Sequence, residues 1–333
     1  MKEYLILIRP YGMLFLGFTP VFGAIANKEF NYLHLTALLT IGLLAHIFTF
    51  VQNDYYDIVI DSKSKYVSNR PLVKGSITRK KALSIYIASF FISLFIAVWF
   101  LFSYYSFFVL LLSFLFITIY NKYSKKFFGM EYILGMGVFT FGIYGALTVS
   151  NIVSNLAIVV SFFGFMQWLF SVGISANLKD VEYDSRMGIK TTPTKFGVRV
   201  SKKEYIIPLS FKIYAVGIKL IHIFAVALPL LLGYTSIFVY NLPIPGVLFL
   251  LVALIAFYYT IKILKTPVIE REKMLIYAGL QEGLSLLLLP IMLLSVLIDV
   301  FGTIQTFLLV LLLIFWPLFW FRVLFGKKMI PLE

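Results

Sequence analysis

The amino-acid sequence predicts an all-α polytopic membrane helix bundle. Of its 333 residues, 61% are hydrophobic and only 13% are charged, whereas a soluble domain has about 45–50% apolar and about 25% charged residues. The mean hydropathy is +0.94, and apolar runs of about 20 residues, the length that crosses the hydrocarbon core, recur along the whole chain. Lipid offers no partner to an unpaired backbone amide, so every span is expected to be a helix.

Ten apolar segments are expected to span the membrane within one embedded domain over residues 1–333. The first is interpreted as a true span and not as a cleaved signal peptide, because its apolar run extends from Leu5 to about Ala26. The predicted segments cover residues 5–27, 33–53, 82–103, 105–120, 130–150, 154–178, 210–233, 244–264, 274–298 and 301–325.

The positions of the basic residues predict the orientation of the chain. With the N-terminus in the cytoplasm, both termini and the loops at 54–81, 121–129, 179–204 and 262–273 hold 26 of the 29 Lys and Arg residues, counting Arg9 and Arg322 near the cytoplasmic ends of the first and last segments. This asymmetry follows the positive-inside rule, so we expect a multi-pass protein of the cell membrane whose termini and active site face the cytoplasm. The net charge of +14 therefore does not indicate nucleic acid, and by itself it does not indicate an anionic substrate either.

The cysteine and histidine content of the chain does not indicate a catalytic or metal site built from these residues. It contains no cysteine, which excludes disulfides, thiolate catalysis and cysteine-ligated metal centres. The three histidines, His34, His46 and His222, lie in separate segments without metal-ligand spacing. We expect them to be structural.

A carboxylate-rich segment follows the second apolar segment directly and opens the loop predicted at 53–81. It has the pattern N-D-x-x-D-x-x-x-D, formed by Asn53, Asp54, Asp57 and Asp61. On a helix these four residues fall within an arc of about 100°. Three carboxylates on one stripe repel each other, and a divalent cation removes that penalty. We predict a Mg²⁺ site rather than a solvated helix end, because Mg²⁺ takes carboxylates together with substrate phosphates.

A second carboxylate cluster opens the loop predicted at 177–204, after the sixth apolar segment. Asn177, Asp180 and Asp184 fall within an arc of about 60° on a helix, while Glu182 lies about 140° from Asn177. We predict that the two aspartates bind metal and act catalytically, that Asn177 and Asn53 help to bind substrate, and that Glu182 matters less.

Three basic residues near these clusters are candidate diphosphate donors, namely Arg9, Arg70 and Lys125. Arginine binds phosphate bidentately and lysine acts as a point charge. Tyr120 precedes the loop that carries Lys125, and we expect it to bind the prenyl chain and shield a cation.

The two acidic faces, if opposed across a cavity, would hold two or more Mg²⁺ ions and neutralise both ends of a diphosphate. Metal ions stabilise the charge on the departing oxygens and make the diphosphate a better leaving group. With an allylic chain attached, ionisation gives a delocalised carbocation. The predicted reaction is therefore transfer of a prenyl group from a prenyl diphosphate.

The paired motifs resemble those of the UbiA-like superfamily of intramembrane prenyltransferases. The resemblance covers about residues 5 to 200, and its further elements are Arg9-Pro10, Asn69-Arg70-Pro71, the Tyr120 to Lys125 spacing, and Gly188 through Lys190-Thr191-Thr192-Pro193 to Phe196-Gly197. It implies nine or ten transmembrane helices around a central cavity that opens to lipid. It also implies Mg²⁺, a prenyl diphosphate donor and an aromatic or lipid acceptor.

Alternatives remain open at this point. A cation-coupled transporter also uses intramembrane acids, but these should lie near the middle of the membrane between broken helices. A lipid-binding scaffold would not require both clusters, and a phosphoribosyl transfer to polyprenyl phosphate would use the same metal chemistry. Gln281 and Glu282, inside the ninth segment, either bind the acceptor or pair with another helix.

Overall fold

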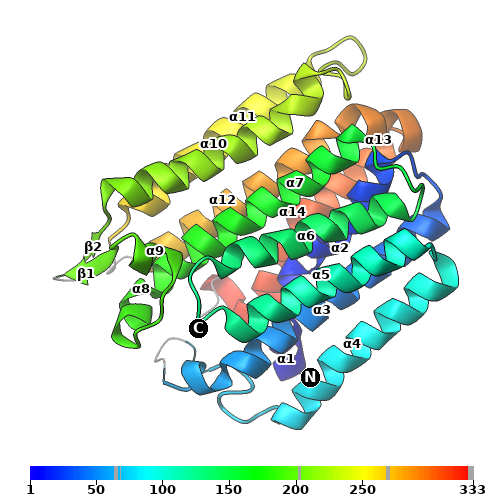
Figure 1. Cartoon of the computed structure of the whole chain (residues 1–333). Helices are drawn as coiled ribbons and strands as arrows, with labels where there is room; N and C mark the ends of the chain where they lie inside the picture. The colour runs from blue at the N-terminus through cyan, green and yellow to red at the C-terminus, as the bar shows by residue number, and fades with distance from the viewer. Residues whose placement is uncertain (64–66, 68, 202–203, 268–270, 329–333) are drawn as a thin grey trace. The chain divides into compact units, whose positions relative to one another are not determined.

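The computed structural model describes residues 1–63, 67, 69–201, 204–267 and 271–328 (Figure 1). Within these residues ten helices are long and apolar enough to cross a membrane, which confirms the predicted spans. The protein is therefore an integral multi-pass membrane protein. The spans are Lys2–Ala26, Tyr32–Asp61, Arg79–Phe100, Tyr104–Tyr123, Met130–Leu147, Asn155–Arg186, Leu209–Leu231, Ile244–Lys265, Glu272–Met292 and Thr303–Phe325.

The chain folds into two compact units. The first comprises residues 1–122, 140–158 and 313–333, and the second comprises residues 123–139 and 159–312. The prediction of one domain around a central cavity stays a prediction. The N-terminal helices are α1 (Lys2–Ile8), the 3₁₀ turn η1 (Pro10–Gly12), α2 (Met13–Ala26), α3 (Tyr32–Asp61), α4 (Arg79–Phe100), α5 (Tyr104–Tyr123) and α6 (Met130–Leu147).

The remaining elements continue from α7 to the C-terminal region. They are α7 (Asn155–Phe170), the π-helix η2 (Ser171–Ala176), α8 (Asn177–Arg186), α9 (Thr192–Lys195), β1 (Arg199–Ser201), β2 (Glu204–Ile206), α10 (Leu209–Leu231), α11 (Ile244–Lys265), α12 (Arg271–Met292), α13 (Leu294–Phe301), α14 (Thr303–Phe325) and η4 (Gly326–Lys328).

Close backbone contact joins the helices of the first unit. Helix α3 packs against both α2 and α4, which runs beside it in Figure 1. A Cβ atom on Gly42 of α3 would lie 2.2 Å from the carbonyl oxygen of Gly17 on α2. Small residues let membrane helices approach closely, because van der Waals packing drives their association in lipid. The glycine pair thus sets the spacing of α2 and α3.

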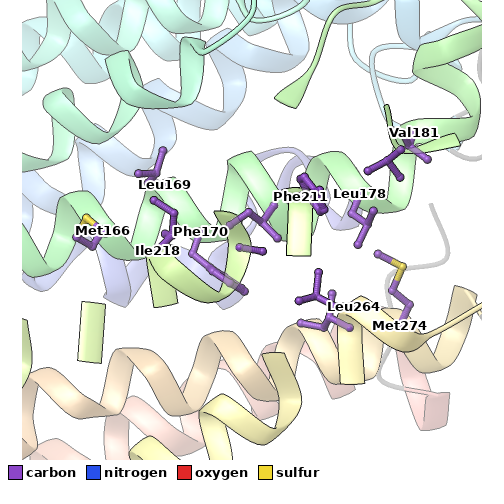
Figure 2. Close-up of a cluster of buried hydrophobic side chains, with 13 residues drawn as sticks. Met166, Leu169, Phe170, Leu178, Val181, Phe211, Ile218, Leu264 and Met274 are labelled. Carbon is purple, nitrogen blue, oxygen red and sulfur yellow. The ribbon is translucent and has the colours of Figure 1, made fainter. Parts of the chain in front are cut away.

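A hydrophobic cluster forms the core of the second unit, and Figure 2 shows side chains from several helices meeting in it. Leu178 and Val181 of α8 are fully buried there. Their burial fixes the rotation of α8 about its axis, and with it the direction of the helix face that carries the second carboxylate cluster. The cluster contains Met166, Leu169, Phe170, Ile174, Leu178, Val181, Val198, Phe211, Ala215, Ile218, Ile263, Leu264 and Met274.

Several predicted boundaries differ from those in the structure. The second and sixth helical spans continue past the predicted ends at 53 and 178, so both carboxylate clusters lie on helices and not in loops. The first span breaks at Arg9, because Pro10 disfavours the right-handed helical conformation for the residue before it. The ninth ends at Met292 and is followed by the separate helix α13.

Among the described residues, a small two-stranded sheet lies between α9 and α10. Strands β1 and β2 pair antiparallel, with Val200 opposite Tyr205. The predicted loop at 179–204 includes β1 and the first residue of β2, and each strand is only three residues long. The all-α prediction for the fold is confirmed for the membrane-spanning part.

Candidate active site

The first carboxylate cluster lies on the last three turns of α3. Asp54, Asp57 and Asp61 are buried, with 3%, 6% and 8% of their surfaces exposed, whereas Val59 is 63% exposed. A polar stripe is thus covered by protein while an apolar side chain on the same turns is not. This is the inverse of an ordinary solvated helix end, and buried carboxylates require positive or hydrogen-bonding partners.

Two arginines supply these partners. Arg9 Nη2 lies 2.7 Å from Asp54 Oδ1, and Arg70 Nη1 lies 3.2 Å from the same oxygen. Arg70 Nη1 also lies 2.7 Å from Asp61 Oδ2, so it bridges two carboxylates that are seven residues apart. Asn53 Nδ2 donates to Asp57 Oδ2 at 3.2 Å. The structure therefore brings together all six residues that the sequence analysis assigned to this part of the site.

The backbone at Arg9 is held in an uncommon conformation. Its φ and ψ are 51° and 61°, in the left-handed region that costs an L-residue roughly 1–2 kcal/mol. His46 Nε2 lies 3.1 Å from the carbonyl oxygens of both Ile8 and Arg9, and Trp316 Nε1 donates to the Pro10 carbonyl at 2.6 Å. These contacts stabilise the break between α1 and α2. The break lets the Arg9 side chain reach Asp54.

A buried amide pair, Asn121 and Gln52, attaches α5 to α3 two residues before the first carboxylate of the stripe. Asn121 Nδ2 donates to Thr49 O at 3.0 Å and to Gln52 Oε1 at 2.9 Å. Gln52 Nε2 donates in turn to Thr118 Oγ1 at 3.3 Å. Neither amide was among the predicted site residues, although an Asn and a Gln at the ends of apolar segments are a signal that the sequence contains. Tyr120, next to Asn121, is partly buried.

The second cluster lies on α8, directly after the π-helix η2. Asp184 is fully buried, and Asn177 and Asp180 are partly buried. Glu182 instead accepts a hydrogen bond from Arg186 at 2.6 Å, and that arginine side chain is 71% exposed. The different surroundings agree with the predicted separation of Glu182 from its neighbours.

Asp184 has one charged partner and unused hydrogen-bonding capacity. Lys125 Nζ lies 3.7 Å from its Oδ1, as expected for two residues assigned to one site. Among the described residues, no hydrogen-bond donor lies within 3.5 Å of either carboxylate oxygen of Asp184, although the side chain of Thr191 interacts with this carboxylate as well. A buried carboxylate without donors is destabilised unless a cation binds it. Its oxygens therefore fit a metal ion.

The described residues contain no group of three His, Cys, Asp or Glu side chains that could hold an ion by themselves. This donor set nevertheless fits Mg²⁺, which commonly takes one or two carboxylates and completes its octahedron with water and substrate phosphates. Asp54 and Asp61, which both pair with the Arg70 guanidinium, and Asp184, whose oxygens have no donor within 3.5 Å among the described residues, are carboxylates of this kind. That the two clusters face one cavity stays a prediction.

The buried polar residues of the ninth span belong to a separate network. Gln281 is fully buried and donates to Ser285 Oγ at 3.2 Å. Lys219 of α10, also fully buried, donates to the same Ser285 hydroxyl and lies 3.1 Å from His222 Nδ1. Of the two readings left open for Gln281, the contacts favour pairing between α10 and α12.

Comparison with known proteins identifies the family. The chain is 29% identical over 206 residues to a digeranylgeranylglyceryl phosphate synthase of Pyrococcus horikoshii, a match that covers 60% of this chain and 71% of the relative. It is 30% identical over 162 residues to a 4-hydroxybenzoate octaprenyltransferase of Francisella tularensis subsp. novicida, covering 48% of this chain and 54% of that relative. The chain thus spans about half the length of the Francisella protein.

The fold is shared with a solved UbiA homologue from Archaeoglobus fulgidus bound to GPP and Mg²⁺. The two structures superpose with a TM-score of 0.57 at 19% sequence identity, over 86% of this chain and 99% of that one. The sequence model of the UbiA prenyltransferase family matches residues 14–278, which include both carboxylate clusters. The resemblance seen in the sequence motifs is therefore confirmed, and this chain belongs to the UbiA prenyltransferase family.

Proposed function

We propose that this protein transfers a prenyl group from a prenyl diphosphate to an acceptor within the membrane, in a reaction that requires Mg²⁺. The observation that carries the proposal is the convergence of Arg9 and Arg70 on Asp54 at the end of α3. Guanidinium groups bind phosphate oxygens bidentately, and carboxylates beside them bind the hard cation that accompanies a diphosphate. Membership of the family supports the same reaction.

Arg9 and Arg70 have two successive tasks in this proposal. In the structure their charges offset those of Asp54 and Asp61. When a diphosphate binds, the guanidinium groups donate to its oxygens instead, and the two carboxylates become available as metal ligands. When bound, Mg²⁺ stabilises the negative charge that develops on the departing diphosphate. Asn53 keeps Asp57 oriented through its amide.

The residues of α8 are proposed to serve the same reaction. Asp184 and Asp180 would bind metal, and Lys125 would donate to a phosphate oxygen from its place 3.7 Å from Asp184. Asn177, one turn before Asp180, adds an amide on the same helix. We therefore expect turnover to require both carboxylate clusters, because each supplies ligands that the other does not replace.

The proposed acceptor is an aromatic compound or a lipid. The names of the two relatives indicate one of each class, a glyceryl phosphate lipid and 4-hydroxybenzoate. Tyr120, partly buried at the end of α5, is proposed to contact the prenyl chain.

Incubation of the purified protein with labelled prenyl diphosphates, and separately with a labelled sugar diphosphate, in the presence of a panel of acceptors tests the proposal. The panel contains aromatic acids, glycerol phosphate lipids and polyprenyl phosphate, each with and without Mg²⁺. The expected result is a Mg²⁺-dependent prenylated product from an aromatic or lipid acceptor. Transfer from a sugar diphosphate to polyprenyl phosphate, or no transfer with any donor, would refute it.

We also propose that the site and both termini face the cytoplasm, as the distribution of basic residues indicates. The absence of native cysteine makes single-cysteine labelling clean. Ser62, next to the first cluster, and Asn151, between α6 and α7, are both exposed. In intact cells an impermeant maleimide should label Asn151→Cys and should not label Ser62→Cys. The reverse pattern would overturn the orientation.

A further inference from the structure

A buried carboxylate outside both clusters holds the second cluster's surroundings together. Glu131, the second residue of α6, is 4% exposed, and Thr192, at the start of α9, is fully buried. The Thr192 hydroxyl donates a hydrogen bond to Glu131 Oε1 across 61 positions of sequence. A buried carboxylate is destabilised without a donor, so this contact favours one placement of α9 against the start of α6.

Glu131 also contacts the π-helix. A Cβ atom on Gly173 would lie 2.8 Å from Glu131 Cγ and 3.3 Å from its Cδ. Only a residue without a side chain leaves room for the glutamate here. Glu131 is therefore packed between η2, which leads into α8, and α9, which follows α8.

The segment between α8 and α9 is folded back on the end of α8. Ile189 N donates to the Asp184 carbonyl at 2.9 Å, after a turn at Gly188 with a φ of 68°. The hydroxyl of Thr194 donates to the carbonyls of Ile189 at 3.2 Å and Thr191 at 2.8 Å. These hydrogen bonds hold the segment against Asp184 and join its residues to α9, which begins at Thr192.

The arrangement of Lys125 and Asp184 consequently depends on Glu131. Lys125 lies six residues before it, in the segment that leads into α6. Asp184 lies on α8, whose entry is packed against Glu131 through Gly173. The 3.7 Å distance between Lys125 and Asp184 therefore depends on how η2, α6 and α9 are fixed to one another.

We propose that Glu131 and Thr192 are positioning residues, whose hydrogen bond holds Asp184 and Lys125 in the arrangement that binds the metal–diphosphate donor. This inference rests on the proposed function. It assigns the pair no contact with substrate. Loss of the bond should loosen donor and metal binding more than it slows a fully loaded enzyme.

The matched substitutions are Thr192→Val, which keeps the shape and removes the hydroxyl, and Thr192→Ser, which keeps the hydroxyl. We expect the valine variant to raise the KM for prenyl diphosphate and the Mg²⁺ concentration for half-maximal rate by about 10-fold or more, as loss of a supporting partner does at metal sites. Its kcat at saturating donor and Mg²⁺ should stay within about threefold, and the serine variant should behave as wild type. Glu131→Gln, which keeps an acceptor oxygen, should also resemble wild type.

Binding of inorganic pyrophosphate with Mg²⁺, measured by calorimetry, gives a readout that does not require transfer. Equal KM and Mg²⁺ requirements in the valine and serine variants, or a loss confined to kcat, would overturn the inference. If Thr192→Val does not fold, Thr192→Ala in the same assays decides in the same way. Absence of any prenyl transfer by the wild-type protein would instead refute the proposed function, whereas unchanged pyrophosphate binding in the valine variant would refute only this inference.

Discussion

Replacement of Arg70 by Gln should weaken the reaction by a predictable amount. Arg70 Nη1 lies 2.7 Å from Asp61 Oδ2 and 3.2 Å from Asp54 Oδ1, and its side chain is only 15% exposed. A hydrogen bond to a charged group in such a place contributes about 1.5–3 kcal/mol. If the donor diphosphate accepts one such bond, kcat/KM should fall by about 10- to 150-fold, since 1.4 kcal/mol corresponds to a factor of ten.

A second measurement separates this role from damage to the fold. In the structure Arg70 and a metal ion would use the same oxygens of Asp54 and Asp61. Removing the guanidinium should therefore tighten the binding of Mg²⁺ alone while it weakens the binding of the diphosphate. A merely misfolded site would lose both. Calorimetric titration with Mg²⁺, and separately with pyrophosphate at saturating Mg²⁺, measures the two effects.

Arg186→Gln is the matched control. Its side chain is 71% exposed and pairs with Glu182 one turn away, an arrangement that contributes about 0.3–0.5 kcal/mol in helices. It should change kcat/KM by less than about threefold. Arg70→Lys should fall between the two, because lysine keeps the charge but not the fork of donors. The reasoning would be refuted if Arg70→Gln and Arg186→Gln had the same kcat/KM.

Two further predictions concern the scaffold of the first unit. Gly42→Ala should lower the free energy of unfolding in detergent by about 1–3 kcal/mol or more, because its Cβ would lie 2.2 Å from Gly17 O. Gly217→Ala is the control, since its Cβ would meet no neighbouring atom within 4 Å among the described residues, and it should be neutral or stabilising. Equal melting temperatures of the two variants would contradict the packing argument. Asn121→Leu removes the hydrogen bonds to Thr49 O and Gln52 Oε1. It should lower the free energy of unfolding by about 1–3 kcal/mol and also lower the affinity for prenyl diphosphate. An unchanged KM for prenyl diphosphate would show that the amide pair between α3 and α5 does not support the site.

The membrane spans could be predicted because lipid reduces the choice of backbone structure. Apolar runs had to be helices, and all ten are. The ends of these helices were harder to predict from the sequence. Asp54, Asp57 and Asp61 are charged residues, yet they occupy the last turns of α3. Hydropathy marks where an apolar run stops, whereas the helix continues as long as its polar residues find partners.

The grouping of residues within the first cluster was also predictable, because the spacing of acids along one helix fixes their common face. The contacts that hold the basic residues in place could not be predicted from the sequence. The left-handed conformation of Arg9 depends on His46 and on Trp316, which donates to a carbonyl 306 positions away in sequence. The buried bond between Glu131 and Thr192 spans 61 positions. Such pairings depend on tertiary packing and leave no periodic signal in the chain.

Mg²⁺-dependent transfer by three single variants shows whether both carboxylate clusters serve one metal–diphosphate reaction. Asp57→Ala and Asp184→Ala each remove a buried carboxylate, one from each cluster, whereas Glu182→Ala removes one that pairs with an exposed arginine. The account predicts that labelled prenyl diphosphate is turned over by wild type and by Glu182→Ala, that both aspartate variants lose turnover, and that chelation of Mg²⁺ abolishes it in all. Normal turnover by either aspartate variant, or turnover that persists after chelation, would contradict it.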